Sequence, residues 1–285
     1  MKAWIWIFLS MILTASCVKE DSVTPGTGTT PAAQTITNVS YGTDAKQKID
    51  IYLPEGRLAD TTKTIVVIHG GGWIEGDKED MTAGIDSLRK RLPGYAVLNI
   101  NYRLAANHTT NLFPSQENDV KAAIEFYLAQ SGENKVSQDL IILGASAGAH
   151  LALLQGYKND PGKHVKAIID FFGPADLHAL WNAGLAQQVI LSSATGKTYD
   201  EDSAIFEESS PVNYITEQSP PTIVLQGGAD NLVPPQQATI LIGKLQAKGV
   251  VNQLVFYPSQ QHGWTGPDLM DSFEKIKVFV LTNVH

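Results

Sequence analysis

The sequence has 285 residues, of which 43% are hydrophobic and 18% are charged. This length suits one large domain or two small ones, and the apolar content excludes a chain that is disordered throughout. Lys and Arg number 21 against 29 Asp and Glu. An acidic chain gains nothing by releasing phosphate counterions, so nucleic acid is not an expected partner. The single cysteine, Cys17, excludes an internal disulfide framework and a thiolate metal cluster.

Residues 1–16 have the features of an export signal. Lys2 precedes an apolar run that is shorter than the ~20 residues of a bilayer-spanning helix. The small residues after this run, together with Cys17, resemble a bacterial lipobox, in which the cysteine is lipidated after cleavage. We therefore expect a lipoprotein-type signal peptide and a lipid anchor on Cys17, which is the only membrane contact expected. A plain cleaved signal with an incidental cysteine is the alternative.

This signal predicts export and places the protein at the outer membrane or cell surface of a Gram-negative bacterium, or in the periplasm. Residues 17–35 comprise the anchor Cys17 and a segment whose residues 22–35 are largely Thr, Pro, Gly and Ala, which offer almost nothing to bury. They predict a flexible tether behind the anchor. The folded domain is then expected over 36–285, where we find no second linker and no internal repeat.

The predicted domain alternates apolar runs with helical periodicity. The predicted strands cover 49–53, 65–68, 95–100, 140–143, 165–172, 222–226 and 253–257. Helices are predicted over 81–92 with Asp80 as its N-cap, 120–131, 146–156, 240–248 and from about 267 onward. Buried strands separated by helices predict an α/β fold with a mostly parallel sheet covered on both faces. Residues 174–215 fit this alternation poorly, and we expect a small helical insertion there.

Ser146 is the candidate nucleophile. It stands in Gly144-Ala145-Ser146-Ala147-Gly148, between a predicted buried strand and a predicted helix. A tight strand-to-helix turn strains the serine backbone and exposes its hydroxyl, and side chains two residues to either side would clash. An ordinary glycine-rich turn is the alternative interpretation.

A second glycine cluster, His69-Gly70-Gly71-Gly72-Trp73, follows the predicted strand 65–68. Its unshielded amides suit an oxyanion, and we expect Gly71, Gly72 and the amide of Ala147 to form an oxyanion hole. A phosphate-binding loop would need a Gly-Lys-Ser/Thr ending or a Gly-x-Gly-x-x-Gly spacing, and neither is present. His69 is expected to organise the loop.

The base follows by elimination among the seven histidines. With a nucleophile on such a turn, the order along the chain is serine, acid, histidine. Asp230 follows the predicted strand 222–226, and only His262 and His285 lie beyond it. His285 is the last residue and is expected to fray, which leaves His262. Asp170 and Asp176 also follow Ser146 and remain alternatives for the acid.

In this arrangement Ser146 attacks a carbonyl carbon, His262 carries the proton, and Asp230 orients the imidazole. No metal or organic cofactor is required.

Six motifs together resemble the α/β-hydrolase superfamily over about 40–284, and within it the bacterial feruloyl and acetyl-xylan esterase-like branch beside the hormone-sensitive-lipase-type esterases. They are His69–Trp73, Asn101–Leu104, Gly144–Gly148, Gly173–Leu177, Gly227–Asp230 with Val233-Pro234, and His262-Gly263. The resemblance implies an eight-stranded, mostly parallel sheet and hydrolysis of carboxylic esters, often acetyl or feruloyl groups on plant polysaccharide. Two departures are a missing Pro-Glu after Arg103-Leu104-Ala105 and Gln226 where a histidine is common.

The leading hypothesis is therefore a serine esterase outside the cell that acts on carbohydrate esters or other short acyl esters. Trp73, Tyr102 and Phe113 are candidates for an aromatic substrate-binding wall, or alternatively for core residues. An arylformamidase-like amide hydrolase of the same fold, and a non-catalytic glycan-binding surface lipoprotein, are the alternatives. The sequence specifies neither the acyl and alcohol groups nor the oligomeric state.

Overall fold

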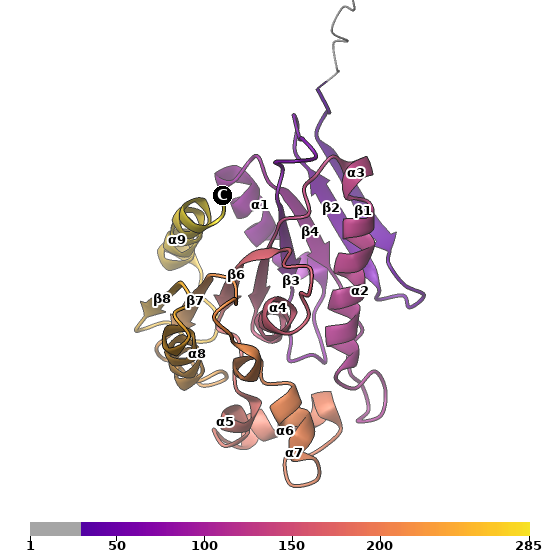
Figure 1. Ribbon diagram of the computed structural model, residues 1–285. Helices are drawn as coiled ribbons and strands as arrows, with labels where there is room; N and C mark the ends of the chain where they lie inside the picture. The colour runs from indigo at the N-terminus through magenta and orange to yellow at the C-terminus, as the bar shows by residue number, and fades with distance from the viewer. Residues whose placement is uncertain (1–29) are drawn as a thin grey trace, which may run out of the picture. The chain divides into compact units, whose positions relative to one another are not determined.

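The computed structural model describes residues 30–285, of which 31–285 form one compact unit (Figure 1). The strands are β1 (Gln34–Ser40), β2 (Lys48–Leu53), β3 (Thr64–Ile68), β4 (Ala96–Ile100), β5 (Leu140–Ala145), β6 (Val165–Phe171), β7 (Thr222–Gly227) and β8 (Asn252–Tyr257). The α-helices are α1 (Thr82–Arg91), α2 (Ser115–Ala129), α3 (Ser131–Asn134), α4 (Ala147–Tyr157), α5 (Leu177–Trp181), α6 (Leu185–Thr195), α7 (Ser203–Glu208), α8 (Gln236–Ala247) and α9 (Gly266–Asn283). Two 3₁₀ turns are η1 (Lys78–Met81) and η2 (Pro211–Tyr214).

The strands form one eight-stranded sheet in the order β1-β2-β4-β3-β5-β6-β7-β8. β2 runs antiparallel to both of its neighbours, and the other pairs are parallel. The prediction of an eight-stranded, mostly parallel α/β-hydrolase sheet is confirmed. The central strands β3 and β4 are buried along their whole length, as expected for strands covered on both faces.

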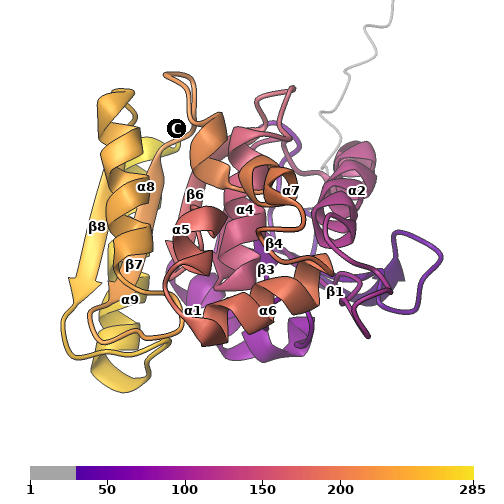
Figure 2. The same ribbon diagram turned by 90° about the horizontal axis from the view of Figure 1, so that it is seen from below.

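Helices cover both faces of the sheet (Figure 2), and the sheet separates the core into two clusters. Helices α2, α4 and α8 pack on one face, where the central helix α4 is buried along most of its length. Helices α1 and α9 pack on the other face, with Ile85, Leu88, Phe273 and Ile276 in the core. Because the parallel strands end at one edge, the loops that follow β3, β5, β7 and β8 gather there.

Two predictions from the sequence are wrong, and the predictions for the N-terminal segment concern residues that the structure does not describe. Gln34 and Thr35, which we assigned to the tether, belong to β1, a strand that its alternating polar residues concealed. Asp80 does not cap α1; it forms a capping box with Asp77 at the start of η1. The predicted signal peptide over 1–16, the lipidation site Cys17 and most of the tether lie outside the described residues. Between residues 30 and 285, no helix has the length and apolar character needed to cross a bilayer.

The segment 174–215 is helical, as predicted. It contains α5, α6, α7 and η2, and Figure 2 shows the three α-helices lying across the α4 side of the sheet. Asp176 and Asp202 cap α5 and α7 by accepting from the amides of Ala179 and Ile205. These short helices bring apolar side chains over the edge at which the strands end.

Asp170 is a buried carboxyl on β6. One oxygen accepts from the Gly173 amide at 2.7 Å, whereas the other has no hydrogen-bond partner among the described residues. Burial raises the pKa of Asp170 to about 7. The folded protein therefore holds a proton that the unfolded chain has lost between about pH 4 and pH 7, so the free energy of unfolding falls as pH rises through this range.

We predict that Asp170→Asn removes this pH dependence, because the amide resembles the protonated carboxyl and cannot ionise. Between pH 5 and pH 7 the free energy of unfolding of the wild type should fall by roughly 2 kcal/mol relative to the variant. Urea unfolding of both proteins at several pH values measures the difference. Parallel profiles for the two proteins would show that Asp170 is ionised in the folded state across this range.

Candidate active site

The structure brings Ser146, His262 and Asp230 into one hydrogen-bonded chain. The Nε2 atom of His262 lies 2.9 Å from the Ser146 Oγ, and its Nδ1 lies 2.7 Å from Asp230 Oδ2. Because the carboxylate can only accept, Nδ1 carries the proton and Nε2 is left to accept from the serine hydroxyl. These are the three residues assigned to catalysis from the sequence. The alternatives for the acid are engaged elsewhere: Asp170 lies inside β6 and Asp176 caps α5.

Ser146 sits on a strained turn between β5 and α4. Its φ of 54° and ψ of −121° are unfavourable for a residue with a side chain. A Cβ at Gly144 would lie 2.2 Å from the Gly148 carbonyl oxygen, and a Cβ at Gly148 would lie 2.3 Å from that of Ile68. The predicted clash at both flanking positions is therefore confirmed. The turn directs the Ser146 hydroxyl into the pocket that it lines.

Asp230 is held by the loop that follows β7. Its Oδ1 accepts from the amides of Leu232 and Val233, each at 2.9 Å, and its side chain is fully buried. The buried Gln226 amide donates to the Val233 carbonyl and lies 3.4 Å from Asp230 Oδ2. These contacts fix the orientation of the carboxylate and leave Oδ2 facing His262.

The glycine loop after β3 has the geometry of an anion site. Gly71 and Gly72 have φ values of 103° and 57°, and both line the same pocket as Ser146. Within residues 30–285 neither amide donates a hydrogen bond to another protein group. The amide of Ala147, as the first residue of α4, has no acceptor within that helix. Two of the three amides assigned to an oxyanion hole, those of Gly71 and Gly72, therefore lie at the Ser146 pocket and are free to bind a charged oxygen, whereas Ala147 is not among the residues that line it.

Trp73 anchors this loop from one side. It adopts a positive φ of 64°, and its indole Nε1–H donates to His150 Nδ1 at 3.3 Å. His150 in turn donates from Nε2 to the Ser209 carbonyl at 2.7 Å, and burial lowers the pKa of His150 to about 4, so the ring stays neutral. His150 was placed only in a helix by the sequence analysis. It connects the loop, the nucleophile helix and the insertion.

Tyr102 and His69 anchor the loop from the other side. Their rings stack at 4.2 Å, and the Tyr102 hydroxyl donates toward the His69 and Gly70 carbonyls. His69 is buried, which lowers its pKa, and its Nδ1 bonds the Gly70 carbonyl at 2.7 Å. It organises the loop, as the sequence analysis expected.

Two of the three residues assigned to substrate binding belong to the core. Tyr102 is 0% exposed and Phe113 is 6% exposed, and neither lines the pocket at Ser146. Their apolar rings pack behind the site, Phe113 against His150. Trp73 does line the pocket, although only 2% of its surface is exposed.

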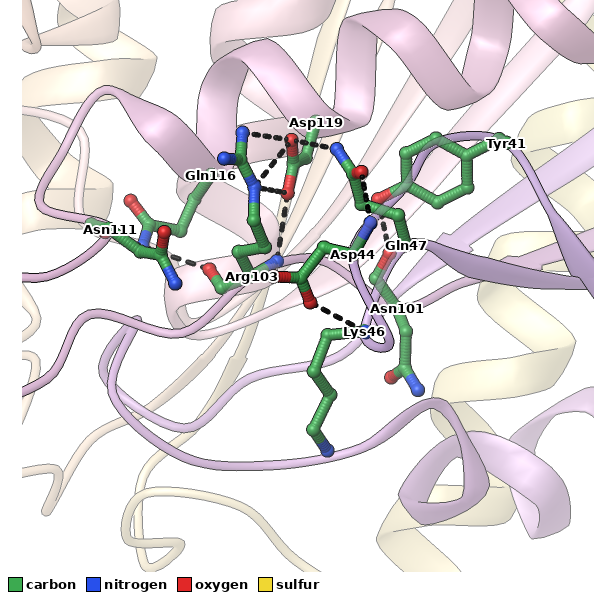
Figure 3. A network of polar contacts seen from close by, with 9 residues as sticks. All are labelled: Tyr41, Asp44, Lys46, Gln47, Asn101, Arg103, Asn111, Gln116 and Asp119. Atoms are coloured by element: carbon green, nitrogen blue, oxygen red, sulfur yellow. Dashed lines mark hydrogen bonds and ion pairs between the residues drawn. The ribbon is translucent and has the colours of Figure 1, made fainter.

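A polar network fixes the chain that follows β4 and carries Tyr102 (Figure 3). Arg103 makes a two-pronged contact with the buried Asp119 of α2, with a shortest distance of 2.7 Å. Gln47 donates to the same carboxylate, and Gln116 donates to the Arg103 carbonyl. The network holds the backbone beneath the glycine loop and is not part of the pocket.

The pocket at Ser146 has a volume of about 240 Å³ and is largely apolar. Its walls also contain side chains that the sequence did not predict to bind substrate: Ile74, Pro174, Leu180, Gln187, Ile190, Leu232 and Val233. Gln187 of α6 also donates to the carbonyls of Asn231 and Leu232, at 2.7 and 3.0 Å, which ties the insertion to the Asp230 loop. Pro174 and Val233 lie in motifs quoted above, but no motif marks Leu180, Gln187 and Ile190, because the insertion reaches the pocket only through the fold.

Comparison with known proteins finds one matching family model and several esterases. The BD-FAE family model matches residues 49–245, a range that includes Ser146 and Asp230 and ends before His262. Two Mycobacterium tuberculosis proteins match 82% of this chain: esterase LipC at 28% identity and the probable carboxylic ester hydrolase LipM at 30%. The chain spans only 60% and 57% of their respective lengths. A solved structure, the bifunctional GH43-CE protein of Bacteroides eggerthii, is similar with a TM-score of 0.78 and 27% identity, over 88% of this chain and 38% of that one.

We predict that Trp73→Phe lowers kcat about tenfold with little change in KM. The ring remains, but the hydrogen bond to His150 is lost, and the loop is then held less firmly where charge develops in the transition state. Steady-state kinetics on p-nitrophenyl acetate measure the effect. Trp181→Phe on α5 is the matched control and should leave kcat unchanged. An unchanged kcat in Trp73→Phe would show that the indole hydrogen bond does not position the loop.

Proposed function

This chain belongs to the BD-FAE family, and from that membership and the site geometry we propose that it is a serine carboxylic ester hydrolase. The observation that carries the proposal is the hydrogen-bonded chain from Ser146 through His262 to Asp230, beside a loop with free amides. The esterases among its relatives and structural neighbours support the same activity.

The proposed reaction has two halves, acylation of Ser146 and hydrolysis of the acyl-enzyme, and His262 and Asp230 have the same roles in both. His262 accepts the Ser146 proton as the serine oxygen attacks the ester carbonyl, and the amides of Gly71, Gly72 and Ala147 bind the resulting oxyanion. The intermediate collapses when His262 gives its proton to the departing alcohol, leaving Ser146 acylated. A water molecule then repeats the attack, with His262 again taking and returning the proton, and releases the acid. Asp230 stabilises the imidazolium throughout.

We propose carbohydrate esters with acetyl or feruloyl groups, or other short acyl esters, as substrates. The pocket of about 240 Å³, with walls of Leu180, Ile190 and Val233, accepts a small apolar acyl group. The exposed residue Glu75 also lines this pocket, and its carboxylate makes the binding of an anionic substrate unfavourable. The similar GH43-CE protein supports a carbohydrate ester. An arylformamidase-like activity is the second candidate, because the same machinery hydrolyses amides.

We expect Ser146→Ala to reduce the hydrolysis of p-nitrophenyl acetate by about 10⁴-fold or more, because the nucleophile is removed. The melting temperature should hardly change, since alanine keeps the Cβ and the hydroxyl supports no packing. Ser87→Ala on α1 is a matched control and should retain full activity. Equal activity of Ser146→Ala and wild type would refute the proposed nucleophile.

The same assay on acetylated and feruloylated xylo-oligosaccharides tests the substrate proposal. Preferential hydrolysis of N-formylkynurenine over all of these esters would favour the formamidase alternative. If the folded wild-type protein hydrolyses none of these substrates, the non-catalytic glycan-binding alternative is favoured.

We also propose that the protein is exported and anchored through a lipid on Cys17, on the basis of the lipobox-like segment before it. In a Gram-negative host, Cys17→Ser should move the protein from the membrane fraction to the soluble fraction and abolish the incorporation of labelled palmitate. Membrane association that persists without this cysteine would contradict the proposal.

A further inference from the structure

A second cavity lies on the opposite face of the sheet from the Ser146 pocket. Its volume is about 280 Å³, and neither Ser146 nor His262 lines it. Its floor is formed by Val67, Leu143 and Phe171, which lie in the C-terminal halves of β3, β5 and β6 and belong to the core cluster of α1 and α9. The cavity therefore reaches the underside of the nucleophile turn from the side that the proposed substrate does not occupy.

The lining of this cavity suits an aromatic ligand. Four rings surround it, those of Phe171, Phe172, Trp264 and Phe273. Asp80 is its one charged lining residue, and its carboxylate is exposed. Aromatic rings stack on one another edge-to-face or offset, and an apolar cavity of ~150 Å³ is large enough to hold a benzene ring. A neutral ring fits this lining, whereas an anion is opposed by Asp80.

The walls are fixed before any ligand binds. The Trp264 indole donates to the hydroxyl of the fully buried Ser272 at 2.9 Å, and that hydroxyl bonds the Asp268 carbonyl at 2.7 Å. Gly84 on α1 leaves part of the space open, since a Cβ there would meet only the Phe273 ring, at 3.6 Å. A pre-formed cavity of this kind costs little conformational entropy to fill.

Two of the lining residues also touch the catalytic histidine. Phe172 adopts a positive φ of 45°, and its ring lies edge-on to His262 at 4.6 Å and to Trp264 at 5.3 Å. Gly263 directly follows His262 in the chain and lines the cavity. A molecule in the cavity therefore packs against the residues that position the imidazole.

We propose that this cavity is a second ligand site, which binds a small neutral aromatic molecule independently of the ester and alters turnover through Phe172 and Gly263. The binding claim stands apart from the proposed esterase function, because it rests on the cavity and not on the triad.

Methionine methyl NMR of the full chain, with toluene as the probe, tests the binding. Met81 lines the cavity, whereas Met270 is 43% exposed on α9 and serves as an internal reference. The Met81 resonance should shift to saturation and show nuclear Overhauser contacts with the toluene ring, and the Met270 resonance should not. Shifts that fail to saturate, or that affect both methyl groups equally, would overturn the proposal.

Two helical glycines provide matched variants. Gly84→Phe should fill the cavity and weaken toluene binding at least tenfold, whereas Gly243→Phe on α8, where a Cβ meets nothing within 4 Å, should leave it unchanged. Benzoate should bind at least tenfold more weakly than toluene, and Asp80→Asn should narrow that gap. If the two glycine variants bind toluene equally well, the assignment of the site to this cavity is overturned. If Gly84→Phe does not fold, the Overhauser contacts between toluene and Met81 in the wild type still test the site.

Kinetics test the coupling separately. Saturating toluene should change kcat on p-nitrophenyl acetate and leave KM unchanged, and Gly84→Phe should abolish this response. A competitive pattern, with only KM affected, would place toluene in the Ser146 pocket and refute a second site. An unchanged kcat with toluene bound at Met81 would refute the coupling, and an inactive wild type that still binds toluene would refute the esterase proposal alone.

Discussion

The close contact between the nucleophile turn and the end of β3 is the constraint on which the site depends. The Cα of Gly148 packs against the Ile68 and His69 carbonyls so tightly that a Cβ would lie 2.3 to 2.4 Å from their oxygens. This approach sets the start of α4 directly beside the glycine loop, so the Ser146 hydroxyl and the loop amides face one pocket. The strain at Ser146 is tolerated because the buried strands and α4 on either side leave the turn no alternative path.

The sequence predicted well those features that depend on local pattern. Seven of the eight strands were located from apolar patterns, and the central ones read as continuous apolar runs because a strand covered on both faces must be apolar throughout. The missing strand, β1, pairs at the edge of the sheet and exposes most of its side chains, so its pattern is polar. The glycines that flank Ser146 were predictable for the same local reason, since backbone contact excludes a side chain.

Features that depend on packing between distant segments could not be predicted in this way. Tyr102 and Phe113 are aromatic residues near catalytic motifs, which favours a binding role, yet their burial behind the loop is decided by α2 and α4. His150 was visible four residues after Ser146, but nothing local indicates that its two nitrogens join Trp73 to Ser209. The pocket walls from α5 and α6 carry no motif, because any apolar side chain of suitable size serves there.

The double role of Gln187 has a consequence for how this protein can acquire new selectivity. One face of α6 shapes the space that receives the ligand, while the Gln187 amide on the same helix holds the backbone of the acid loop. The insertion therefore cannot be replaced by an unrelated segment to change selectivity without also affecting the acid loop. A graft that reshaped the binding space without supplying an amide at this point would also loosen the carboxylate that orients the imidazole, so selectivity and reactivity would have to evolve together.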